Sequence, residues 1–194
     1  MNVTAESWPR PHRLTVDEYY RMVKVGLLSP DDRVELIEGE IVDMPPIGSR
    51  HAAKVTVLAK LLIRAVGDTA DVRIQAPVRL GSRSEPQPDL ALLKRSSNAY
   101  ANAHPAAADV LLLIEVSEST LHFDLNAKAR LYAKYGIPEY WVVDLIDNQL
   151  HCHRRPAGER YQDCSTVSSG SVRCAALDFA IDITALFAAT IARA

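Results

Sequence analysis

Residues 110–116, with the sequence VLLLIEV, constrain the fold more than any other segment of this 194-residue chain. Apolar side chains occupy both alternating faces of the run, which is typical of a strand buried in the middle of a sheet. Glu115 lies inside it, where an ionised carboxylate is costly unless it is paired with a cation or bound to a metal. We therefore expect a central strand that carries one buried carboxylate, unless Glu115 faces solvent at the strand end.

Periodic patterns on either side of this strand predict both helices and further strands. Helical patterns lie at 15–26, where Thr15 and Glu18 predict a capping box, and at 49–66, 119–135 and 182–192. Strand patterns lie at 33–44, as a hairpin hinged at Glu38 and Gly39, at 72–81, 89–93 and 140–145, and as a second hairpin at 148–174. This order predicts an α/β or α+β fold, with a mixed central β-sheet flanked by helices and a C-terminal β-hairpin and helix. We expect residues 12–194 to form a single domain after an N-terminal extension, residues 1–11.

Composition narrows the class of protein. Hydrophobic residues make up 48% of the chain and charged residues 24%, which excludes a disordered or fibrous chain. The longest apolar runs have five residues, against the roughly 20 that cross a bilayer. We therefore expect no membrane association. The N-terminal sequence has no secretory pattern and the chain has three cysteines, so a cytoplasmic protein without a disulfide framework is expected.

Charge is unevenly distributed along the chain. The formal net charge is −2, yet residues 45–100 carry nine lysines and arginines against four acidic residues. A basic middle segment in an acidic protein can dock a phosphate backbone on one face. Chance clustering of surface charge is the alternative.

Two further residues are unusual for structure alone. Asp89 follows Pro88 at the start of a strand expected beside Glu115, although it can also cap a turn. Lys128 falls within the apolar stripe of the following helix, formed by Leu121, Leu125 and Tyr132, unless its stem reaches the surface. Two carboxylates and a lysine that converge in this way are typical of a metal-dependent nuclease, in which the lysine orients the attacking water.

A series of motifs occurs in order along the chain: RVELIEGEIVDM, His51, QPDLALL, LLIEVSEST and DLNAKARLYAKYGIPEYWVVD. The block from Glu115 through Asp144 is the most specific of them. With this series the chain resembles the Uma family of restriction endonucleases in the PD-(D/E)XK nuclease superfamily, over about residues 12–187. One position departs from the superfamily pattern, because Ser117 stands where a lysine is expected.

The resemblance implies a restriction-endonuclease-like sheet with Asp89 and Glu115 as ligands of Mg²⁺ or Mn²⁺, and Lys128 in place of the lysine missing at position 117. It implies an endonuclease, a hydrolase of phosphodiester bonds whose partner is DNA, and by analogy a homodimer. The alternative is a catalytically weak or inactive binding module on the same scaffold, acting in a defence or mobile-element complex.

Several residues complete the expected site. Glu35 occupies an early acidic position of the family and is a further candidate for metal or water contact, although a solvated hairpin face also explains it. His51 is either a core histidine with its hydrogen bonds satisfied, or a residue that supports the site or contacts a phosphate at the start of its helix. One sector of its helix carries a basic set expected to follow a nucleic-acid backbone, or to be covered by a partner protein: Arg50, Lys54, Lys60 and Arg64.

A zinc site is a weaker alternative. The histidines and cysteines of the C-terminal part cluster in the chain, at His151, Cys152, His153, Cys164 and Cys174. No Cys-x2-Cys pair is present among them, and structural zinc sites typically contain one. We therefore expect no zinc there.

Overall fold

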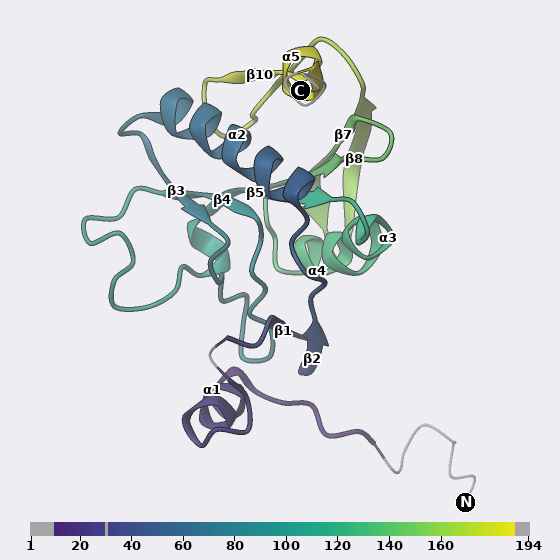
Figure 1. Ribbon diagram of the computed structural model, residues 1–194. Coiled ribbons are helices and arrows are strands. Elements are labelled where there is room, and N and C mark those ends of the chain that lie inside the picture. The colour runs from purple at the N-terminus through teal and green to yellow at the C-terminus, as the bar shows by residue number, and fades with distance from the viewer. Residues whose placement is uncertain (1–9, 30, 189–194) are drawn as a thin grey trace, which may run out of the picture.

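A six-stranded mixed sheet organises the computed structural model, which describes residues 10–29 and 31–188 (Figure 1). The strands lie in the order β3-β4-β5-β6-β7-β8, and all neighbours are antiparallel except the parallel pair β5–β6. Their bounds are β3 Ala70–Ile74, β4 Leu90–Lys94, β5 Val110–Ser117, β6 Glu139–Asp144, β7 Gln149–Ala157 and β8 Arg160–Val167. The predicted central strand is therefore confirmed as β5, which has two strands on one side and three on the other.

Helices cover both faces of this sheet, which makes the fold α+β as expected. The helix α2, Ser49–Val66, packs on one face together with α5, Ile183–Ala188, and the small pair β9, Ser171–Arg173, and β10, Ala180–Asp182. The other face packs against α4, Ala129–Lys134. Alternation along β5 places Leu112 and Ile114 in the α2 core and Leu113 in the α4 core. Glu115, two residues after Leu113, therefore belongs to the α4 side.

A hairpin and a helix extend from one end of the sheet (Figure 1). The hairpin consists of β1, Val34–Ile37, and β2, Glu40–Asp43, and α1 is Val16–Lys24. Both residues of the predicted hinge have a positive φ, Glu38 at 49° and Gly39 at 82°, as a two-residue type I′ hairpin requires. The predicted capping box at the start of α1 is also confirmed, because Thr15 and Glu18 exchange hydrogen bonds.

The helix after β5 is less regular than its sequence pattern. It begins as α3, Leu121–Phe123, continues as a π-helical turn, η2, Asp124–Lys128, and ends as α4. The α-helical pattern missed this turn, since an apolar stripe does not reveal one inserted residue. A π-turn inside a helix commonly marks a functional site, and this one contains Lys128.

The predicted bounds of one strand were wrong. The strand expected at 72–81 is β3, and it ends at Ile74 because Gln75 has a φ of 45° and leaves the extended conformation.

The short 3-10 helix η1, Ala107–Asp109, interrupts the long loop before β5. The last helix is described only to Ala188, so the predicted residues 189–192 lie outside the described part, as do residues 1–9 of the expected extension. Within the described residues, no helix is long and apolar enough to cross a membrane.

Candidate active site

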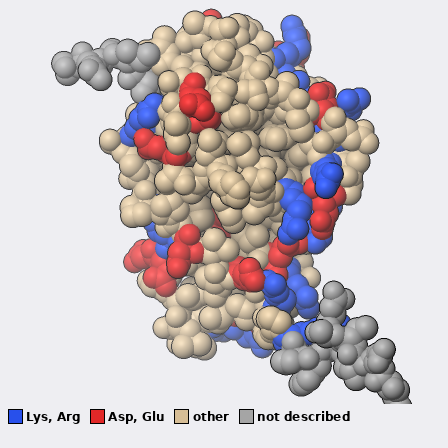
Figure 2. All heavy atoms as spheres, turned by 90° about the vertical axis from the view of Figure 1, so that its right-hand side faces the viewer, with Lys and Arg blue, Asp and Glu red and all other residues tan. Residues whose placement is uncertain are grey.

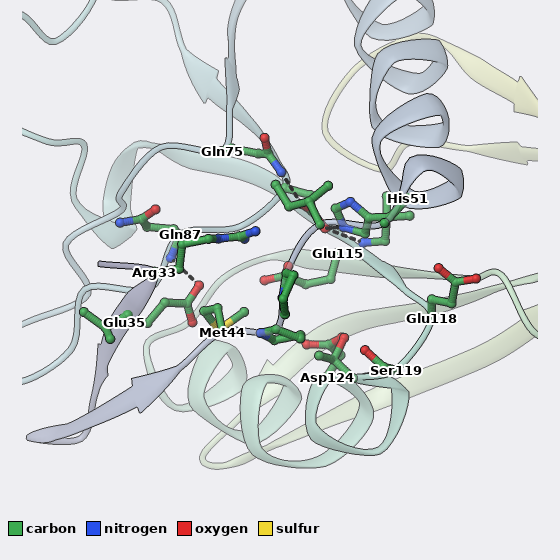
Figure 3. Close-up of a pocket in the computed structure, with 18 of the residues that line it drawn as sticks. Arg33, Glu35, Met44, His51, Gln75, Gln87, Glu115, Glu118, Ser119 and Asp124 are labelled. Carbon is green, nitrogen blue, oxygen red and sulfur yellow. Dashed lines mark hydrogen bonds and ion pairs between the residues drawn. The ribbon is translucent and has the colours of Figure 1, made fainter. Parts of the chain in front are cut away.

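A pocket of about 300 Å³ opens where β1, β5 and the start of α2 meet. Figure 3 shows Glu35, His51, Glu115 and Asp124 approaching the same space from β1, α2, β5 and η2. Asp89, which directly precedes β4, lines the same pocket. The residues expected at the site from the sequence, other than Lys128 and the basic set of α2, therefore line one hollow.

Asp89 is held in position by several hydrogen bonds at the start of β4. The register of β4 and β5 pairs Leu90 with Ile114, which brings Asp89 beside the end of β5. The backbone amide of Val116 donates to Oδ2 of Asp89 at 2.8 Å, and the side-chain Nε2 of Gln75 donates to Oδ1 at 3.1 Å. Asp89 is 8% exposed. It is thus a fixed part of the pocket wall rather than a turn cap.

His51 also contacts this carboxylate. Its Nε2 lies 2.9 Å from Oδ2 of Asp89, and the hydrogen bond with Asp89 raises the pKa of His51 above its ordinary value. The first turn of α2 extends over the pocket, so the imidazole lines it with 17% of the side chain exposed, and its hydrogen-bond partner is Asp89. This geometry agrees with the alternative, a residue that supports the site.

Glu115 and Glu35 share one cation, Lys128. Nζ of Lys128 lies 2.9 Å from Oε1 of Glu115 and 3.2 Å from Oε1 of Glu35. The Tyr132 hydroxyl donates to the same Oε1 of Glu115 at 2.9 Å. Glu35 is 2% exposed and its Oε1 also accepts from the amide of Gln87. The alternative that Glu35 lies on a solvated hairpin face is thus wrong, because β1 packs against this cluster.

Lys128 faces inward, as its place in the apolar stripe predicted, and does not reach the surface. Its side chain is 0% exposed, and it lies behind the two glutamates rather than in the pocket wall. Burial opposes its charge, but the carboxylates of Glu115 and Glu35 raise its pKa above the ordinary lysine value. Lys128 is therefore a charged ammonium held against carboxylates that face the pocket.

Asp124 is a pocket residue that sequence reasoning missed. Its Oδ2 accepts hydrogen bonds of 2.6 Å from the hydroxyls of both Ser117 and Thr120, and the residue is 2% exposed. Ser117, which replaces the expected lysine, therefore anchors this carboxylate. The spacing of Asp124 and Lys128, four residues apart on the inward stripe, was the signal that would have identified it.

The pocket wall carries more negative than positive buried charge. Glu35, Asp89, Glu115 and Asp124 are all at least 92% buried, and a single buried cation, Lys128, lies behind two of them. Burial, opposed by Lys128 and reinforced by Asp124 and Asp89, raises the pKa of Glu115 well above its ordinary value. Carboxylates in excess of nearby cations favour binding of a divalent ion. The donor set therefore fits Mg²⁺ or Mn²⁺, which Asp89 and Glu115 would hold.

No larger ligand cluster exists in the part of the chain described. Across residues 10–29 and 31–188, no group of three His, Cys, Asp or Glu side chains is arranged to hold a metal ion. This includes the C-terminal histidines and cysteines, of which Cys152 and Cys174 are buried and Cys164 is exposed. The expected Mg²⁺ site needs only two side-chain carboxylates, since this ion commonly keeps several waters.

The basic sector of α2 is only partly available to a ligand. Lys60 and Arg64 are exposed, but Arg50 donates to the carbonyl of Leu145 and forms an ion pair with Glu118. Lys54 is 1% exposed, and its ammonium donates to the carbonyl of Leu186. The prediction of a surface contact is therefore wrong for Lys54, because α5 packs over this part of α2, a contact that a helical wheel does not contain.

Comparisons with known proteins agree with this architecture. A model of the Uma2 family, described as "Putative restriction endonuclease", matches residues 16–185. The crystal structure of "a putative nuclease belonging to DUF820" from Anabaena variabilis ATCC 29413 superposes with a TM-score of 0.72 and 19% identity, covering 92% of this chain and 99% of that chain. At this identity the likeness concerns the fold alone. Among curated proteins, none is significantly similar to the chain. Because the family match spans most of its length, the chain belongs to the Uma2 family.

Proposed function

We propose that this protein is a Mg²⁺- or Mn²⁺-dependent endonuclease of the PD-(D/E)XK type that hydrolyses phosphodiester bonds in DNA. The observation that carries the proposal is the convergence of Asp89 and Glu115 on one pocket, with the Lys128 ammonium 2.9 Å from Glu115. Membership of the Uma2 family supports nuclease activity. The fold supports it independently of any single motif.

The carboxylates have distinct tasks in this proposal. Asp89 and Glu115 would hold the ion, which would supply Lewis-acid chemistry for activating water and polarising the phosphate. Val116, Gln75 and His51 orient Asp89 through their hydrogen bonds. A carboxylate fixed by three donors keeps its position as substrate enters, which a flexible one does not.

Lys128 and Glu35 act together beside the metal ligands. Lys128 keeps a positive charge between Glu35 and Glu115, and this charge opposes the rise that burial causes in the pKa of Glu115. Glu35 lines the pocket and is placed to accept a proton or hydrogen bond from a water there. We propose that Lys128 assists the attacking water through these two carboxylates, in the role of the lysine replaced by Ser117.

Plasmid nicking tests the proposal directly. Supercoiled plasmid, single-stranded DNA and RNA are incubated with the protein in Mg²⁺, Mn²⁺ or EDTA, together with the Asp89→Ala variant. We expect nicking of DNA with either cation and none with EDTA or the variant. Cleavage that persists in EDTA, or that is undiminished in Asp89→Ala, would contradict the metal assignment, and cleavage of RNA alone would contradict the substrate.

A second candidate function is supported by the burial of Lys128. Because its ammonium is enclosed by Glu35 and Glu115, the same scaffold suits a binding module that holds nucleic acid without cutting it. Tight binding of DNA with no cleavage under any cation favours this second function. The homodimer expected by analogy with other nucleases of this scaffold is measured by sedimentation in the same buffers.

A further inference from the structure

A second hollow, of about 790 Å³, shares no lining residue with the carboxylate pocket. It is a groove between α1 and the loop that follows β4, with part of its wall from β3. Its chemistry is cationic and aromatic, and the principal side chains are Tyr20, Arg21, Lys24, Arg73, Arg79 and Tyr100. We call the hollow lined by these six residues the basic groove.

The cations of the basic groove are mostly without acidic partners. Arg79 is engaged, since its Nε lies 2.8 Å from a carboxylate oxygen of Glu85 and its Nη1 lies 3.8 Å from Asp17, an acidic residue that also lines the groove. Arg21, Lys24 and Arg73 form no salt bridge with any residue in the described part of the chain. Nη1 of Arg73 is buried and has no hydrogen-bond partner there. A buried guanidinium donor without an acceptor is costly, and a phosphate oxygen is its natural acceptor.

Two tyrosines give the basic groove flat apolar surfaces. Tyr20 is 39% exposed, and its hydroxyl donates to Glu85, the same carboxylate that Arg79 contacts. Tyr100 has a φ of 61°, a conformation that bulky side chains rarely adopt, and its hydroxyl donates to the carbonyl of Lys94. Neighbouring side chains also hold the rings in place, because the Arg79 guanidinium lies 5.8 Å from the centroid of Tyr20 and Tyr100 packs partly against the core under α4. A fixed ring beside free cations is the arrangement on which unpaired bases stack.

One short segment of chain links the basic groove to the carboxylate pocket. Arg73 lines the groove and Gln75 lines the pocket, where it bonds to Asp89. Two residues of extended chain span at most about 7 Å, so the two sites are neighbours. A single polynucleotide strand can therefore contact Arg73 while one of its phosphates lies at Asp89.

The opposite side of the molecule offers no comparable surface. In Figure 2, which shows the side away from β3, lysines and arginines are interspersed with acidic residues around a broad uncharged area. Mixed charge of this kind gives little net attraction for a phosphate backbone. The basic groove thus combines unpaired cations, aromatic faces and access to the pocket.

We propose that the basic groove binds a single-stranded segment of the nucleic-acid substrate, next to the phosphate that is cleaved. Arg73, Arg21 and Lys24 contact its phosphates, and Tyr20 and Tyr100 stack with its bases. The inference rests on the proposed nuclease function for the identity of the ligand. Binding itself requires neither metal nor cleavage, so it is tested separately.

The first test measures binding in EDTA by fluorescence anisotropy. A labelled single-stranded DNA of mixed sequence is titrated with the full-length protein and with the triple variant Arg21→Gln, Lys24→Gln, Arg73→Gln. We expect at least tenfold weaker binding, and a slope of log K against log salt smaller by about 2, since each phosphate contact on a single strand contributes about 0.7. Arg160→Gln, at the opposite edge of the sheet on β8, is the matched control and should bind as the wild type does.

A second test separates stacking from charge. Tyr100→Leu removes the ring, whereas Tyr100→Phe removes only the hydroxyl. We expect Tyr100→Leu to bind single-stranded DNA about fivefold or more weakly and Tyr100→Phe to stay close to wild type, because stacking of one base on a ring accounts for a factor of this size. An abasic oligonucleotide should remove the difference between these two variants.

Three results would overturn the inference. They are unchanged affinity and salt slope in the triple variant, an equal loss for single-stranded and duplex DNA, and no measurable binding of single-stranded DNA by the wild type. The proposed nuclease function fails differently, through cleavage that does not depend on Asp89. Asp89→Asn should therefore bind the oligonucleotide in EDTA at least as well as the wild type, even though it does not cleave.

Discussion

Lys128 and Glu115 form an ion pair in the interior of the protein, with Nζ 2.9 Å from Oε1 and the two residues 13 positions apart in the chain. Their side chains are 0% and 5% exposed. Removing one member of a buried pair leaves the other charge without compensation, which is more damaging than losing an exposed pair. The pair therefore links the stability of the fold to the charge of the candidate site.

The first prediction concerns Lys128→Met. The substitution keeps most of the buried stem but leaves Glu115 and Glu35 without their shared cation. We expect the free energy of unfolding to fall by about 3–5 kcal/mol, measured by chemical denaturation. Cleavage should fall by about 10²–10³-fold under conditions where circular dichroism shows the variant folded.

Two companion variants interpret this result. Lys134→Met removes an exposed lysine that pairs with Glu38 on the outer side of the same helix, and should cost no more than about 1 kcal/mol. Adding Glu115→Gln to Lys128→Met removes one of the two carboxylates left without a cation, and should restore part of the stability but none of the cleavage. Wild-type stability and activity in Lys128→Met would show that the ion pair is not part of the site.

The second prediction concerns divalent cations. Wild-type protein should bind Mn²⁺ in titration calorimetry, and its melting temperature should rise with Mn²⁺ concentration, because an ion that binds only the folded state stabilises it. Asp89→Asn should lose both effects, since one of the two carboxylate ligands is replaced by an amide. Asp68→Asn, an exposed aspartate paired with Arg95, serves as the control and should behave as wild type. Equal Mn²⁺ binding by wild type and Asp89→Asn would refute the assignment.

The third prediction compares the exposed basic residues of α2 with its buried lysine, Lys54. Lys60 and Arg64 are exposed, so Lys60→Gln with Arg64→Gln should weaken duplex DNA binding and lower its salt slope by roughly 2 without changing stability. Lys54→Met should lower the stability and leave duplex DNA binding unchanged, because the Lys54 ammonium is buried against Leu186 and Phe187 rather than open to DNA. Anisotropy titrations at several salt concentrations, with thermal melts of each variant, provide both readouts. A loss of binding with Lys54→Met at unchanged stability would contradict the placement of α5.

The fourth prediction tests the hairpin that carries Glu35. At Gly39, which has a φ of 82°, an added Cβ would lie 2.8 Å from Cβ of Arg13 and 2.9 Å from the carbonyl oxygen of Leu14. Gly26 has a similar φ of 76° but nothing within 4 Å. Both Gly→Ala variants incur a backbone cost of roughly 1–2 kcal/mol, and Gly39→Ala should lose about 1–3 kcal/mol more through the clash. Denaturant titration measures both, and equal losses would mean that the contact with Arg13 and Leu14 is unimportant.

Patterns within single segments predicted much of this fold and part of the site. The bounds of α2 were predicted correctly from its apolar periodicity. The central strand β5 was predicted because apolar side chains occupy both of its faces. Glu115 and Lys128 were identified because each places a charge among apolar neighbours, where a charge needs a partner. These inferences succeed because side-chain direction in a helix or strand follows from local geometry alone.

The other contacts of the site depend on how distant segments meet. Lys128 and Glu35 are separated by 93 residues, and His51 and Asp89 by 38, so no local pattern contains either contact. The same holds for Lys54, which its helix places on a charged sector but which α5 buries. The sequence by itself determined which side chains are too polar for their surroundings. Only the tertiary structure decided which partners they have, because strand register and helix packing are set by the free energy of the whole core.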